Sequence, residues 1–105
     1  MAEKNLLVDD ETDLLEALSE RMRTRGMEVT TSVSAKEALD AVEQGSYDAV
    51  VLDLMMPDVD GLEALRILKE KDPKLQVILL TGHATVEKGV EAMKRGALDL
   101  LEKPT

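Results

Sequence analysis

The chain has 105 residues, which predicts a single domain spanning 1–105. Its formal net charge of −9 argues against nucleic-acid binding by this segment, because phosphate contacts need clusters of Lys and Arg. The sequence has no cysteine, so disulfides and thiolate chemistry are excluded. No apolar run approaches the roughly 20 residues that span a membrane, and no signal-peptide pattern opens the chain, so we expect no membrane contact and a cytoplasmic location.

Short apolar runs alternate with longer amphipathic segments from the start of the chain. Residues 5–8 have the pattern of a buried strand, and the segment 12–25 predicts a helix that stops at Gly26. The apolar face of this helix carries Leu14, Leu15, Leu18 and Met22. Residues 28–32 are rich in β-branched side chains and predict a second strand.

The middle of the chain repeats the pattern. Ser34 and Glu37 form a capping box that opens a second helix, and this helix ends at Gly45. The run 49–52 is apolar throughout and predicts a third strand that is buried on both faces.

The last part of the chain contains two more helix–strand pairs. Asp60 begins another capping pattern, and Pro73 breaks the helix that follows it. Residues 76–80 predict the fourth strand and 98–102 the fifth. The helix between them ends at Gly96, and we expect its inward side chains to be Val86, Val90 and Met93.

This alternation predicts an α/β fold with a doubly wound, five-stranded parallel sheet between helices. The sequence stops directly after the fifth strand, so the final helix that would lie beside the first one is absent from this chain. We therefore expect an exposed apolar strip on that face of the sheet, unless the chain continues.

Polar residues follow four of the predicted strands at their carboxyl ends, where such sheets place their active sites. They are Asp9 and Asp10, then Asp53, then Thr81, and finally Lys103. Asp10 alone would read as a helix N-cap, but paired acidic residues facing a third one indicate more than capping. Ionised carboxylates in one crevice repel one another, and a hard divalent cation such as Mg²⁺ removes that repulsion.

Asp53 directly follows a rigid apolar strand, and an aspartate carboxylate can act as a nucleophile toward phosphorus. Phosphoryl transfer needs positioning and positive charge more than covalent chemistry from the protein. Lys103 and a bound Mg²⁺ would supply charge, and Thr81 would donate a hydrogen bond to a phosphoryl oxygen. The pattern predicts that Asp53 accepts a phosphoryl group.

From Leu6 to its last residue the chain resembles the receiver domain of two-component response regulators. The resemblance rests on the blocks at 8–11, 47–53, 56–57 with 60–61, 80–82 and 102–104. It implies a flavodoxin-like strand order 2-1-3-4-5 and a phosphoacceptor signalling domain that catalyses only its own phosphorylation and dephosphorylation.

The resemblance also implies partners and site roles. Asp53 would receive phosphate from a sensor histidine kinase or a histidine phosphotransfer protein, and the switched surface would act on an effector domain or form a dimer. Asp9, Asp10, Asp53 and the carbonyl group of Met55 would hold Mg²⁺. Thr81 and Lys103 would contact the phosphoryl group, with a cis bond before Pro104.

Two features depart from that family. Leu100 stands where many members have the aromatic residue of a switch, and the final helix is missing. The main alternative is therefore a degenerate receiver that binds proteins without being phosphorylated.

Other classes fit less well. A haloacid dehalogenase-type phosphatase needs a second Asp where this chain has Met55. A flavodoxin-like cofactor site would place phosphate against Asp9 and Asp10, and a dinucleotide site needs a Gly-x-Gly-x-x-Gly pattern that is missing here.

Overall fold

The computed structural model describes residues 3–53, 60–81 and 86–102. Strands and helices alternate in the order β1 (Lys4–Val8), α1 (Thr12–Thr24), β2 (Glu28–Ser32), α2 (Ala35–Gln44), β3 (Ala49–Asp53), α3 (Gly61–Lys71), β4 (Gln76–Thr81), α4 (Val86–Lys94) and β5 (Asp99–Glu102). Every strand pairing is parallel, and the sheet order is β2-β1-β3-β4-β5. The predicted doubly wound fold and strand order are confirmed.

Helix boundaries follow the local signals in the sequence. Ser34 Oγ accepts a hydrogen bond from Glu37 N at 3.2 Å, and Asp60 Oδ1 accepts one from Leu62 N at 2.8 Å. Each bond satisfies a backbone donor in the first turn of its helix, as predicted. Gly26 follows α1 with φ 86°, a left-handed conformation that glycine adopts without steric cost.

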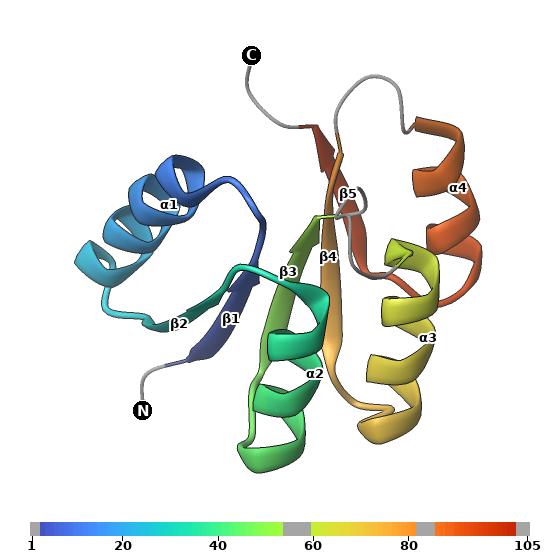
Figure 1. Cartoon of the computed structure of the whole chain (residues 1–105), viewed down its shortest axis with the longest axis horizontal. Helices are drawn as coiled ribbons and strands as arrows, with labels where there is room; N and C mark the ends of the chain where they lie inside the picture. Colours follow the sequence, from blue (N-terminus) through green and yellow to red (C-terminus); the bar gives the residue numbers. More distant parts are fainter. Residues whose placement is uncertain (1–2, 54–59, 82–85, 103–105) are drawn as a thin grey trace.

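The main core lies between the sheet and helices α2, α3 and α4. Figure 1 shows these helices on one side of the sheet and α1 by itself on the other. Leucine, valine and alanine fill this core, because the chain has only one aromatic residue, Tyr47. Its fully buried large side chains include Leu52, Leu65, Leu68 and Leu79.

The α1 face of the sheet is covered less completely. Val51 and Ile78 share this face, since they are register partners of each other and Val51 is the partner of Leu7. Both are only half-buried, and Leu101 on β5 is 49% exposed. The expected apolar strip is therefore present in the structure.

The inward face of α4 was predicted wrongly. Val90 is 49% exposed and Met93 is 39% exposed, whereas Ala92 is fully buried. A nine-residue helix has apolar residues on two faces, and α4 packs through its small side chain, which allows a close approach to its neighbours. The side chain of Val86 lies outside the described residues.

The remaining boundaries differ by one residue from the prediction. β3 and β4 each extend to include Asp53 and Thr81, so both site residues end a strand rather than follow it. β5 begins at Asp99, although Leu98 N already donates to Val77 O at 2.7 Å. Among the described helices, none is long and apolar enough to cross a membrane.

Candidate functional site

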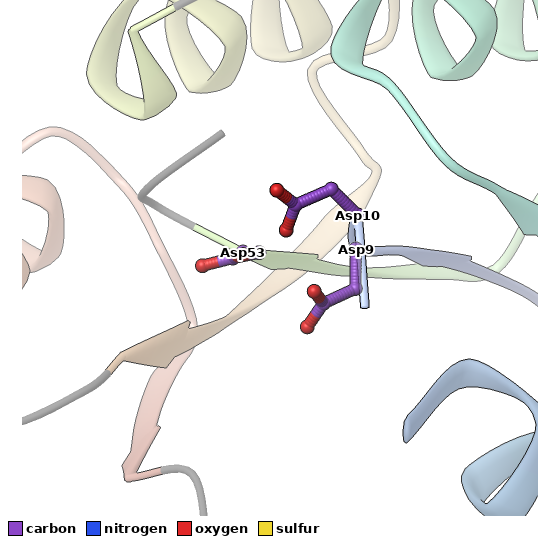
Figure 2. Close-up of side chains that lie close together, drawn as sticks. All are labelled: Asp9, Asp10 and Asp53. Atoms are coloured by element: carbon purple, nitrogen blue, oxygen red, sulfur yellow. The ribbon is translucent and has the colours of Figure 1, made fainter. Parts of the chain in front are cut away.

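The candidate site lies at the carboxyl ends of the two central strands β1 and β3. Asp53 is the last residue of β3, and Asp9 directly follows β1. The strands are in register, with Val8 opposite Leu52, so the two acidic residues come next to each other at the same edge of the sheet. Figure 2 shows Asp9, Asp10 and Asp53 gathered at this edge.

The carboxylates are close enough to share one ion. One oxygen from each of Asp9, Asp10 and Asp53 can be chosen so that all lie within 4.8 Å of one another. Asp9 is 1% exposed and Asp53 is 2% exposed, while Asp10 is open to solvent. Two of the ligands are thus fixed in the protein interior and the third faces water, which suits a cation that keeps part of its hydration shell.

Backbone contacts hold Asp9 in place. Asp9 N donates to Ser32 O at 3.1 Å, which extends the β1–β2 ladder past the end of β1. Asp9 Oδ1 accepts from Glu11 N at 2.9 Å, so the carboxylate also fixes the turn into α1. The carboxylate is therefore positioned by β1, β2 and the start of α1 together.

Asp10 is not a helix cap. The N-cap residue of α1 is Glu11, and the structure gives it no side-chain capping bond. The interpretation of Asp10 as a helix cap is therefore not supported. Its carboxylate points to the same cluster as those of Asp9 and Asp53.

The donor set fits Mg²⁺. All three side chains offer oxygen, which hard divalent cations prefer, and Mg²⁺ usually binds through one or two carboxylates and several waters. A cluster of three ionised carboxylates, two of them buried, is costly without a positive charge. Asp9, Asp10 and Asp53 would hold the ion.

Other predicted site residues are described in part or not at all. Thr81 is the last residue of β4, one position beyond Leu80, which is the register partner of Asp53. Its backbone is therefore at the same edge, but its side chain lies outside the described residues. Met55, Lys103 and the bond before Pro104 also lie outside them.

Comparisons with known proteins identify the family of this chain. The family model for the response regulator receiver domain matches residues 6–105. The chain belongs to this family and is therefore a phosphoacceptor domain of two-component signalling. Within the part of the chain that the structure describes, the acidic residues that were predicted to converge do so, which does not favour a degenerate site.

Individual relatives are regulators of transcription. The chain is 44% identical over 100 residues to the C4-dicarboxylate transport transcriptional regulatory protein DctD of Pseudomonas aeruginosa, covering 94% of this chain and 21% of DctD. It is 38% identical to the transcriptional regulatory protein FixJ of Bradyrhizobium diazoefficiens, covering 93% of this chain and 48% of FixJ. The chain thus spans from about a fifth to about half of these relatives.

Solved structures show the same fold. A receiver domain protein from Clostridium thermocellum superposes with a TM-score of 0.93 at 36% identity, covering 98% of this chain and 83% of that one. The response regulator TrrA of Thermotoga maritima, solved in complex with Mg²⁺-BeF, gives a TM-score of 0.86 at 32% identity and covers 97% and 87% of the two chains.

Proposed function

We propose that Asp53 is the phosphoacceptor and that Asp9, Asp10 and Asp53 hold the Mg²⁺ ion that supports its phosphorylation. The observation that carries the proposal is the approach of the three carboxylates to within 4.8 Å. Asp53 sits at the end of a buried strand, so its oxygen has a fixed position from which to attack phosphorus.

The transfer is a simple displacement. A carboxylate oxygen of Asp53 forms a bond to phosphorus while the bond from phosphorus to the donor's imidazole nitrogen breaks, and the imidazole leaves with that electron pair. When bound, Mg²⁺ would neutralise negative charge on the phosphoryl oxygens. We assign Asp9 and Asp10 to holding it, with the carbonyl group of Met55 as a further ligand.

Thr81 and Lys103 complete the proposed site. Thr81 would donate a hydrogen bond to a phosphoryl oxygen, and Lys103 would pair with its charge. Support for Thr81 comes from its place at the end of β4, next to the end of β3. Support for Lys103 comes from its place in the sequence, directly after β5.

The proposed partners follow from the chemistry of an aspartyl phosphate. Its donor would be a phosphohistidine on a sensor kinase or a phosphotransfer protein in the cytoplasm. The domain would be a regulator rather than an enzyme acting on other substrates, and its effect would pass to an effector domain or protein.

Exposed apolar side chains offer a surface for contact with such an effector. Val90 and Met93 are three residues apart on α4, and Leu98, which precedes β5, is 54% exposed. We assign these residues to contact with the effector or with a second receiver. Residue 100 is a leucine, packed against the core, so this chain has no aromatic side chain at this position to act as a switch.

The test is phosphorylation by a small acyl phosphate. Wild type incubated with the donor and Mg²⁺ should gain the mass of one phosphoryl group, measured on the intact protein. Asp53→Asn should gain nothing, whereas Asp40→Asn, the same change at an exposed position on α2, should behave as wild type. Absence of any gain in wild type, when a control receiver is modified, would favour a phosphorylation-independent binding module.

A further inference from the structure

A side chain of α1 makes a hydrogen bond to the outer edge of β2. β2 is the terminal strand of the sheet, and its other edge pairs with β1. Arg23, in the last turn of α1, donates from Nη2 to the carbonyl oxygen of Val29 at 3.0 Å. The side chain of Arg23 is exposed, so the contact is made on the surface of the protein.

The ladder shows which backbone groups point outward from β2. Glu28 N donates to Glu3 O, and Ser32 O accepts from Asp9 N. Since alternate residues of a strand direct their backbone groups to opposite sides, Glu28, Thr30 and Ser32 bond to β1. The N–H and C=O groups of Val29 and Thr31 therefore point away from the sheet.

These outward groups are self-complementary. In an antiparallel pair of two β2 strands centred on Thr30, Val29 of each copy lies opposite Thr31 of the other. Such opposed residues exchange both of their hydrogen bonds, so this register would use every outward group of Val29 and Thr31. Thr30 would face Thr30, a favourable cross-strand pair, and Glu28 would face Ser32, so that no like charges meet.

Other features of the edge also suit strand addition. Val29, Thr30 and Thr31 are consecutive β-branched residues, which favour extended structure. A cavity of about 280 Å³ lies between α1 and this edge, lined by residues that include Leu15, Thr31 and Val33. Val33 is 44% exposed, so it adds apolar surface to a groove that polar side chains of α1 also line.

Arg23 already donates to one of the acceptor groups that this pairing needs. In the self-complementary register the carbonyl group of Val29 must accept from Thr31 of the second copy, and in the structure it accepts from Arg23. A charged side chain on an edge strand is a recognised protection against edge-to-edge association. We propose that Arg23 is a gate that closes the outer edge of β2 to the β2 strand of a second copy of this chain.

A matched pair of variants tests the gate. Arg23→Ala and Arg21→Ala remove the same charge from the last turn of α1, but only Arg23 bonds to β2. We expect the dimer dissociation constant of unphosphorylated Arg23→Ala, measured by sedimentation equilibrium, to be lower than that of Arg21→Ala by about tenfold or more. High ionic strength is used because the net charge of −9 on each copy opposes association.

A second change locates the interface. Thr31→Pro removes an outward N–H that the β1 ladder does not use, and proline is tolerated on the open side of an edge strand. Arg23→Ala combined with Thr31→Pro should return to the monomer, with far-ultraviolet circular dichroism and thermal unfolding showing that each variant is folded. Equal dissociation constants for Arg23→Ala and Arg21→Ala would overturn the proposal, as would association that persists in the double variant.

Discussion

Asp9 directly follows β1 and Asp53 ends the adjacent strand β3; both residues are at most 2% exposed, and their carboxylates approach within 4.8 Å. Two buried carboxylates at this separation destabilise the folded state when both are ionised, because they repel each other. A cation bound between them attracts both and so replaces repulsion with attraction. The behaviour of the domain with and without Mg²⁺ therefore reports directly on this pair.

The first prediction is that Mg²⁺ stabilises the fold. An ion that binds only the folded state raises the free energy of unfolding by about 2.7 kcal/mol when its free concentration is a hundred times its dissociation constant. The midpoint of thermal unfolding should rise with added MgCl₂ and fall back with a chelator.

Asp10→Asn should weaken this effect, because Asp10 belongs to the cluster but is exposed and not part of the core. Asp13→Asn, three residues away in the first turn of α1, is the control and should keep the full response. A response that Asp10→Asn and Asp13→Asn share equally with wild type would place the ion elsewhere.

The second prediction concerns Asp53→Asn in the absence of Mg²⁺. The two charges that remain in the cluster repel each other less than three, and a pair of charges near 5 Å at an effective dielectric of 20 costs about 3 kcal/mol. The variant should be more stable than wild type by roughly 1 to 3 kcal/mol in urea unfolding without Mg²⁺. With saturating Mg²⁺ the extra stability of Asp53→Asn should shrink or vanish. A variant less stable than wild type both with and without Mg²⁺ would contradict the proposed repulsion between the carboxylates.

The third prediction separates the core from the exposed patch. Leu68 on α3 is fully buried, whereas Leu98 is 54% exposed. Leu68→Ala should cost about 2 to 5 kcal/mol, because it removes buried methylene groups and leaves a cavity. Leu98→Ala should change the free energy of unfolding by less than about 0.5 kcal/mol. Similar losses for the two variants would show that Leu98 is covered in solution.

Much of the fold could be predicted because its signals are local. Gly26 follows α1 in a left-handed conformation and Ser34 begins α2 by accepting a hydrogen bond from Glu37 N, and both signals involve only neighbouring residues. The face of α4 could not be predicted in the same way. Val90 and Met93 have helical spacing, but Ala92 is the buried residue, and the elements that α4 packs against, α3, β4 and β5, select the face.

The candidate site could be predicted for a topological reason. Parallel strands end at one edge, so acidic residues at the carboxyl ends of β1 and β3 must come near each other once those strands are neighbours. The hydrogen bond that Glu11 N donates to Asp9 Oδ1 and the bond that Arg23 donates to Val29 O could not be predicted. Both depend on the direction of a side chain in three dimensions, which spacing in the sequence does not determine.

The fourth prediction compares two glycines. Gly26 has φ 86°, and a Cβ atom there would meet nothing within 4 Å, so the penalty of Gly26→Ala is purely conformational. We expect a loss of about 1 to 2 kcal/mol in urea unfolding. Gly45 ends α2 with φ −143°, and its Cβ atom would make ordinary contacts, the nearest at 3.7 Å to Ala41 O. Gly45→Ala should be neutral or slightly stabilising, and an equal loss at both positions would contradict the backbone argument.

The last prediction is a titration on the surface of α3. Arg66 donates to Glu63, and this bond and its charge hold the pKa of the Glu63 carboxyl below its ordinary value. The folded pKa lies below the unfolded one, so the pair stabilises the fold above the unfolded pKa and this contribution is lost as the pH falls through the folded pKa. An NMR titration should show the lowered pKa in wild type and its return upward in Arg66→Gln. Arg21→Gln, which removes an arginine from a different helix, should leave the titration unchanged. Because Glu63 is exposed, the effect of the pair on stability should be small and should decrease with added salt. If the pKa of Glu63 is the same in Arg66→Gln as in wild type, the pair does not form in solution.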